Sequence, residues 1–176
     1  NLIIEGSLDS KTEIIVEPRY AYIMNFQHCS NIEIKNITAS HTVTEYRCDE
    51  GVLNFNNCAE IKIQNTHLYG CGSIGLCLQE VNKLEFLNSH ITECSLRAIK
   101  ICNSENIKFN NAVFRNVKEY HEFAMIRNSC NVEFNNCNVL DNLCNCDFID
   151  VADETNIIFN SCNFSNNQCR YSIDEG

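Results

Sequence analysis

The 176-residue sequence is poor in proline, glycine, basic residues and long hydrophobic runs, with one proline, 6 glycines and 13 Lys and Arg. No apolar stretch approaches the roughly 18 residues that a membrane-spanning helix requires, so we expect no membrane span. Against 23 Asp and Glu, the basic residues leave a formal net charge of −10. This balance argues against nucleic acid as a partner, because phosphates require a basic surface.

The chain begins with Asn1 and shows no signal peptide. We therefore expect a mature form or a part of a longer chain, and its cellular location is unknown from the residues alone. Hydrophobic residues make up 44% of the sequence, which is sufficient for one domain with a core.

Six copies of a short motif recur along the chain. Each copy has two apolar residues in alternation, usually followed by asparagine, as in NVEFNNCNV at Asn131–Val139. The first apolar residue of each copy serves as its anchor, and the spacings between anchors are 23 to 29 residues. The anchors are Ile32, Ile61, Leu84, Ile107, Val132 and Ile157. A period in this range indicates a solenoid or repeat array.

Apolar residues also recur upstream and downstream of each anchor, with a period of two and no helical periodicity. The sequence therefore predicts three short strands per repeat. Without a crossover helix, each strand must stack in parallel on its own copy in the next repeat, ~4.8 Å away. We predict an all-β fold over residues 1–176: a single-stranded right-handed parallel β-helix of about seven coils.

A polar column accompanies the anchors. Four residues after successive anchors stand Asn36, Asn65, Asn88, Asn111 and Asn136. Asparagine tolerates the left-handed conformation of a sharp bend. Stacked amides also hydrogen-bond to one another, as in other stacked strands. We predict a buried structural asparagine ladder at these positions.

Three segments depart from the repeat. Residues 1–30 are expected to form an irregular N-terminal coil, and residues 41–50 (HTVTEYRCDE) an inserted loop in the longest repeat. Residues Arg170–Gly176 have no matching coil after them and no amphipathic cap. We therefore expect the chain to continue or to associate end to end there.

The segments EPRYAYIMNF, HTVTEYRCDEGVLNFNNC and LYGCGSIGL, together with the repeat, resemble a known group. The chain is similar over nearly its whole length to right-handed parallel β-helix proteins of the pectate-lyase-like superfamily, and within it to bacterial repeat proteins of unassigned activity. The resemblance implies an exported or cell-surface bacterial protein. The superfamily includes polysaccharide lyases and hydrolases, carbohydrate-binding proteins, tailspikes and adhesins, and the fold does not choose among them.

An acidic residue stands ten positions before each of the last two anchors. Glu122 and Asp147 are neighbours in one column, with Asp150 three residues further on. Glycoside hydrolysis needs two carboxylates facing one groove, so these three residues are the catalytic candidates. With Asp153 they are also candidate calcium ligands, because calcium prefers oxygen. The alternative is a solvated acidic edge.

His67 and His90 occupy one outward column on adjacent coils, and Cys71 and Cys94 follow each by four residues. Imidazoles and thiolates bind zinc or copper, which makes this set a metal candidate. Repetition alone also produces such columns, and we expect no cofactor.

The 13 cysteines include stacked pairs such as Cys29/Cys58 and Cys137/Cys162. The cysteine columns also contain Val81, Ala112 and serines, so cysteine alternates there with small buried residues. Since the count is odd and no spacing matches a disulfide framework, we expect reduced interior thiols.

Two functions follow as hypotheses. The first is a non-catalytic scaffold or carbohydrate-binding module for a polysaccharide or cell-surface glycan, based on a flat face with Tyr22, Asn25, Asn54, Asn56 and Gln79. The second is a polysaccharide-active lyase or glycoside hydrolase.

Overall fold

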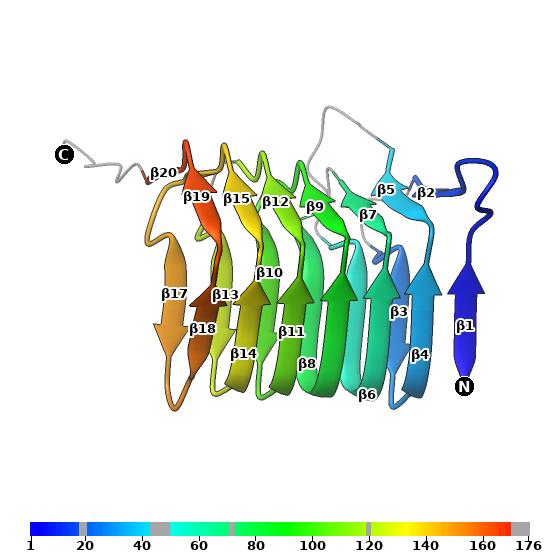
Figure 1. The fold of residues 1–176 in the computed structure, drawn as a ribbon, viewed down its shortest axis with the longest axis horizontal. Coiled ribbons are helices and arrows are strands. Elements are labelled where there is room, and N and C mark those ends of the chain that lie inside the picture. Colours follow the sequence, from blue (N-terminus) through cyan, green and yellow to red (C-terminus); the bar gives the residue numbers. More distant parts are fainter. Residues whose placement is uncertain (18–20, 43–49, 71–72, 119–120, 170–176) are drawn as a thin grey trace.

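The computed structural model describes residues 1–17, 21–42, 50–70, 73–118 and 121–169. Parallel strands stack along one axis into a β-helix, with the N-terminus and the C-terminus at opposite ends (Figure 1). Each coil contributes strands to three faces. The all-β parallel β-helix predicted from the repeat is confirmed. No helix in the described residues is long and apolar enough to cross a membrane.

The first face contains the strands that precede the anchors. They are β3 (Met24–Gln27), the beginning of β6 (Leu53–Gln64), the beginning of β8 (Ile74–Leu87), β10 (Arg97–Cys102), β13 (Ala124–Arg127) and β17 (Ile149–Ala152). The strands β6 and β8 continue through the bend, so the first and second faces form one sheet.

The second face contains the anchor strands. They are β1 (Leu2–Glu5), β4 (Ser30–Lys35), the ends of β6 and β8, β11 (Glu105–Asn110), β14 (Cys130–Asn135) and β18 (Ile157–Asn160). The register places each predicted anchor on the next, for example Ile32 on Ile61 and Ile107 on Val132. These strands form a stack of seven coils.

The third face is a separate sheet of short strands. They are β2 (Glu13–Val16), β5 (Thr38–His41), β7 (His67–Tyr69), β9 (His90–Thr92), β12 (Val113–Arg115), β15 (Asn138–Leu140) and β19 (Asn163–Ser165). A small pair, β16 (Leu143–Cys144) and β20 (Gln168–Cys169), lies beside the last coils.

The N-terminal coil, expected to be irregular overall, continues the apolar alternation of the repeat in its strands. Leu2 and Ile4 pair in register with Ile32 and Ile34, and β2 pairs with β5 over its full length. Most of the predicted inserted loop, and residues 170–176, lie outside the described residues.

Aromatic rings stack along the interior. Phe109 lies 4.6 Å from Phe134, and Phe134 lies 4.8 Å from Phe159, between ring centroids. The same positions in neighbouring coils hold Ile63 and Phe86, which are fully buried. In the last coil Phe159 is 38% exposed, and Val151 and Phe164 are exposed as well. The core is thus continuous through the stack and open at its final coil.

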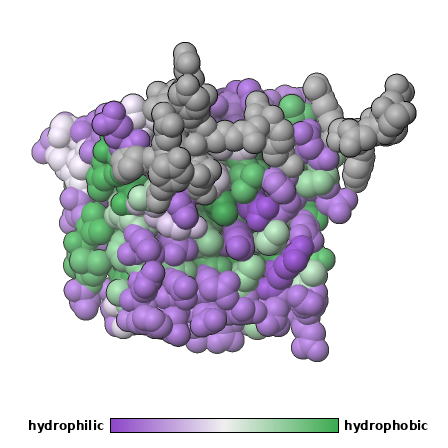
Figure 2. Space-filling view, turned by 180° about the vertical axis from the view of Figure 1, so that it is seen from behind, coloured by the Kyte–Doolittle hydropathy of each residue, from purple (hydrophilic) through white to green (hydrophobic). Residues whose placement is uncertain are grey.

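Tight turns separate the first and second faces. Figure 2 views the molecule from behind, from the side of the first face, and hydrophilic residues gather along its lower edge, where these turns lie. Many turn residues have positive φ, including Asn103 at 50° and Asn106 at 59°. Asparagine accounts for most of them, because its short polar side chain tolerates this conformation.

Candidate functional site

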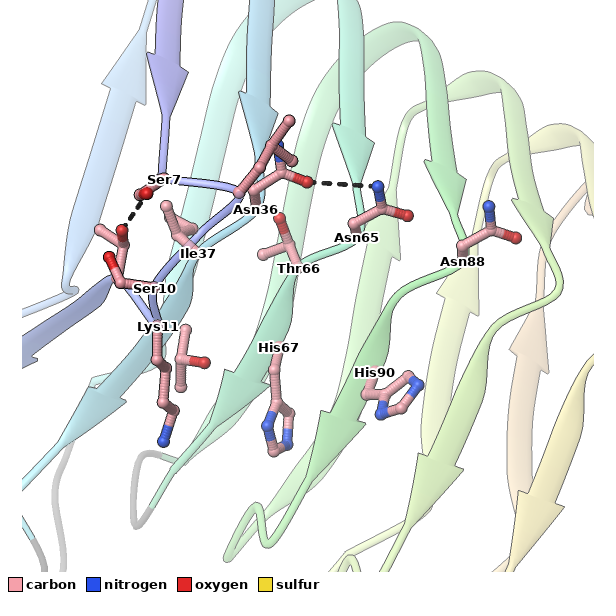
Figure 3. A pocket seen from close by; sticks show the side chains of 13 residues that line it. Ser7, Ser10, Lys11, Asn36, Ile37, Asn65, Thr66, His67, Asn88 and His90 are labelled. Carbon is pink, nitrogen blue, oxygen red and sulfur yellow. Dashed lines mark hydrogen bonds between the residues drawn. The ribbon is translucent and has the colours of Figure 1, made fainter.

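A polar groove of about 480 Å³ lies where the loop between β1 and β2 approaches the next three coils. Figure 3 shows the side chains that line it. The loop contributes Ser7, Ser10, Lys11 and Thr12. The coils contribute Asn36, Thr38, Asn65, His67, Asn88 and His90. The groove therefore crosses successive coils, and its donors and acceptors come from a strand face and from the adjoining bend.

The register of the third face explains this lining. Thr38 pairs with His67, and His67 with His90, so these side chains form one outward column. On the same strands the alternate residues Leu68 and Ile91 are fully buried. Strand alternation thus sends the apolar residues into the core and the imidazoles toward the groove.

The predicted asparagine column forms the second wall of the groove. Asn36, Asn65 and Asn88 have φ values of 58°, 50° and 48°, as the bend requires. Asn65 Nδ2 donates to Asn36 Oδ1 at 3.2 Å, and Asn111 Nδ2 donates to Asn88 Oδ1 at 3.0 Å. The column is therefore ladder-like.

The expectation that this ladder is buried is wrong. Asn65, Asn88, Asn111 and Asn136 are exposed and Asn36 is half-buried. Asparagine is required here by the left-handed backbone rather than by burial. The amide groups that the ladder bonds leave unused are therefore accessible from the groove.

The two imidazoles are close neighbours. The ring centroids of His67 and His90 lie 5.7 Å apart with an edge-to-face angle of 66°, and Tyr69 lies 5.8 Å from His67. His67 Nε2 is 2.7 Å from Thr92 Oγ1. Burial lowers the pKa of His67, and the positive charges of His90 and Lys11 lower it further.

The structure separates Cys94 from the two histidines of the metal candidate. Cys94 is 1% exposed, so it lies in the core while His90 is exposed. Cys71 lies outside the described residues. Among the residues described, no group of three or more His, Cys, Asp or Glu is placed to hold a metal ion.

The acidic candidates are also placed differently from the prediction. Glu122 is 5% exposed, and its Oε1 lies 2.9 Å from Nη2 of Arg97, which is 6% exposed. Cys146 Sγ lies 3.7 Å from Glu122 Oε2. Glu122 is thus part of a buried ion pair and not of a solvated edge.

The other two carboxylates differ from Glu122 in burial and in partners. Asp150 stands on β17 and forms an ion pair with Arg127. Asp147 is exposed, in the segment before β17. With Asp153, these residues do not form a calcium-binding group within the described part of the chain.

The polar face predicted around Tyr22 lies on the first face. Asn54 Nδ2 donates to Asn25 Oδ1 at 2.9 Å, and Asn56 lies in register with Gln79. Tyr22 is half-buried and hydrogen-bonded to Cys77 and Glu50, and burial is the main cause that raises its pKa. The phenol of Tyr22 is therefore engaged with neighbouring side chains of the protein.

The eleven cysteines that the structure describes are free thiols. Cys58, Cys94, Cys137 and Cys144 are buried, as expected for interior residues. Burial raises the pKa of Cys94 and Cys144 to about 12 and that of Cys137 to about 11. Cys130 and Cys169 are exposed.

We expect two classes of thiol in the folded protein. Iodoacetamide at pH 8 should modify Cys130 and Cys169 rapidly and leave Cys94, Cys137 and Cys144 unmodified, because the thiolate is the reactive form. Peptide mass mapping measures this. In denaturant without reductant, a thiol titration should find most cysteines free, and four or more disulfides would contradict the assignment.

Sequence reasoning identified the histidines and asparagines of the groove but not the loop that closes it. The loop residues belong to no copy of the repeat, so the sequence did not show which side chains they would lie beside. These residues are Ser7, Ser10, Lys11 and Thr12. The available signal was the cluster of serine and threonine between two apolar segments, which is typical of a loop. Ser7 N donates to Thr12 Oγ1 at 2.9 Å, which holds this loop closed.

Comparison with known families gives one clear result. The family described as "Right handed beta helix region" matches residues 19–147 and, in a second alignment, residues 50–174. No curated protein matches the chain. The matched residues cover most of the coils of Figure 1 and agree with the parallel register of all three faces. The chain therefore belongs to the right-handed β-helix family.

Proposed function

We propose that this protein is a non-catalytic β-helix scaffold that binds carbohydrate, and that the groove beside the third face is its binding site. The observation that carries the proposal is the lining of the groove: amides, hydroxyls and two imidazoles repeat along the helix axis. Binding sites are concave and present a few converging polar groups. The groove has this form.

The chemistry of the lining suits a hydroxyl-rich ligand. Beyond the ladder bonds, Asn65 keeps one N–H and its carbonyl oxygen, and Asn88 keeps both N–H groups. The hydroxyls of Ser10 and Thr38 can each donate and accept. The apolar side chains of Leu8 and Ile37 also line the groove and suit the C–H surface of a sugar ring. Such a lining favours sugars over purely apolar ligands.

The direction of the groove favours an extended partner. The groove residues Asn36, Asn65 and Asn88 stand at the same position in successive coils, ~4.8 Å apart. A polysaccharide or a cell-surface glycan that lies along the axis would meet an amide at each of these coils and an imidazole at two of them. This is the partner class we propose.

The carboxylates support a non-catalytic role over the enzymatic alternative. Hydrolysis requires an acid and a base on opposite sides of a shared space. Glu122 is buried against Arg97 and Asp150 is paired with Arg127, while the groove lies beside the third face and has no carboxylate in its lining.

A glycan array combined with activity assays on acidic and neutral polysaccharides tests the proposal. We expect binding without turnover. Ser10→Arg, which fills the groove, and His90→Ala should each weaken binding at least about tenfold, a loss of about 1.4 kcal/mol. Asn163→Ala is the matched control, because Asn163 is an exposed residue in the same column as His90 but in the last coil.

Two results would overturn the proposal. One is binding that Ser10→Arg and His90→Ala leave intact. The other is turnover of a polysaccharide that Glu122→Ala, Asp147→Ala or Asp150→Ala abolishes while the variant stays folded, which would establish the enzymatic alternative.

A further inference from the structure

Three nitrogen-bearing side chains follow one another along the groove, with His67 between Lys11 and His90 (Figure 3). Lys11 comes from the loop before β2, His67 from β7 and His90 from β9. In Figure 3 the amine of Lys11 and both imidazoles point to the same side of the chain. After burial, the charges of His90 and Lys11 are the further causes that lower the pKa of His67.

The lining of this groove is unusual for so acidic a protein. The chain carries 23 Asp and Glu, yet none of the residues that line the groove is acidic. The neighbours of His67 on β5, β7 and β9 are Thr38, Tyr69 and Thr92, which carry no charge at neutral pH.

One carboxylate approaches the cluster. Lys11 Nζ lies 2.5 Å from Oε1 of Glu13, at the start of β2, and the side chain of Lys11 is 68% exposed while that of Glu13 is 39% exposed. Asp9, in the same loop, is exposed and does not line the groove. An exposed ion pair of this kind is weak, so Lys11 is available to another anion.

We propose that Lys11, His67 and His90 form an anion subsite that binds a carboxylate or sulfate group of the ligand and binds it more tightly as the pH falls. This inference rests on the proposed function and deepens it, because it specifies that the glycan carries acidic groups. Once both histidines are protonated, a bound anion would offset the repulsion among the two imidazolium rings and the Lys11 ammonium.

The sign of the pH effect follows from the free protein. Because the pKa of His67 is lowered below its ordinary value, the unliganded groove holds this imidazole neutral near pH 7. An anion stabilises the imidazolium, so binding takes up a proton. By linkage, affinity must then increase as the pH decreases through the region where histidine titrates.

Three probes separate the binding of the anionic group from the binding of the sugar ring. They are sodium sulfate, glucuronate and glucose, each titrated at pH 8 and pH 5.5 at constant ionic strength. Both anions keep their charge over this range, so a pH effect belongs to the protein. The histidine ring protons, followed by NMR, report binding at the subsite. We expect sulfate and glucuronate to bind about tenfold more tightly at pH 5.5 than at pH 8, and glucose to show no pH dependence.

Variants that remove a positive charge and a variant that removes a negative charge should change anion affinity in opposite directions. Lys11→Gln and His90→Gln should weaken anion binding severalfold, and His90→Gln should reduce its pH dependence. Glu13→Gln should strengthen binding, because it removes the competing carboxylate. Lys100→Gln is the matched control, because it removes one lysine charge on β10 of the first face.

The outcomes distinguish the two proposals. Anion binding that is equal at both pH values, or unchanged in Lys11→Gln and His90→Gln, overturns the subsite even if neutral glycans bind in the groove. Conversely, pH-dependent sulfate binding at these residues with no glycan binding supports the subsite and overturns the carbohydrate function.

Discussion

Glu122→Gln should lower the free energy of unfolding by about 3–5 kcal/mol, the usual cost of removing one partner of a buried ion pair. The reason is the location of Arg97. Its guanidinium is almost entirely excluded from water, and its Nη2 is 2.9 Å from the Glu122 carboxylate. Without that carboxylate, Arg97 would retain a buried positive charge with no counter-charge. Urea unfolding followed by circular dichroism measures the loss.

Two controls make this prediction specific. The double variant Arg97→Met/Glu122→Leu should recover most of the loss, because it removes both charges and leaves apolar volume. Asp150→Asn breaks the more exposed Arg127 pair and should cost less than about 1 kcal/mol. If Glu122→Gln and Asp150→Asn had equal effects, Glu122 would not be isolated from solvent.

The repeat predicted the fold in detail because one physical constraint acts at every coil. A one-residue shift would turn Ile32 and Ile34 outward, so the apolar alternation fixes the register of each anchor strand on the next. The same alternation in Leu2 and Ile4 extended the stack to the N-terminal coil. Strand faces were therefore predictable from the sequence.

Corners of the coil were less predictable, because side-chain direction there does not follow strand alternation. Glu122 occupies a corner column that also contains Gly51 and Ile74, both buried. These two residues were a signal of burial that the charge of Glu122 concealed. At the other corner, the asparagine column was identified by its left-handed backbone, and its exposure is a separate property that the residue type does not determine.

The groove was only half predictable. Its wall of His67, His90 and asparagines follows from stacking, which the repeat specifies. Its other wall comes from a loop outside the repeat, and only the folded N-terminal coil brings Lys11 toward His67. Sites built from one repeating and one non-repeating element therefore need the structure, even when the fold does not.

Phe109→Ala should destabilise the protein by about 3–5 kcal/mol, the range for a fully buried phenylalanine truncated to alanine. Phe109 is 0% exposed and lies at the centre of the aromatic stack, with Phe134 at 4.6 Å, Phe114 at 5.6 Å and Phe86 at 5.7 Å between ring centroids. The truncation leaves a cavity that rigid neighbouring coils cannot close, because each coil is held by the ladders on both sides. Urea unfolding again measures the effect.

Phe159→Ala is the matched control, since Phe159 occupies the same column in the last coil and is 38% exposed. It should cost clearly less than Phe109→Ala, because it removes less buried surface. In a solenoid each coil contacts only its neighbours, so damage in a central coil also interrupts the coupling between the two halves. Phe109→Ala should therefore broaden the unfolding transition or split it, whereas Phe159→Ala should leave it single. If both variants lost the same free energy of unfolding, the central coil would be no more tightly packed than the last coil, and the idea of a continuous packed core would be wrong.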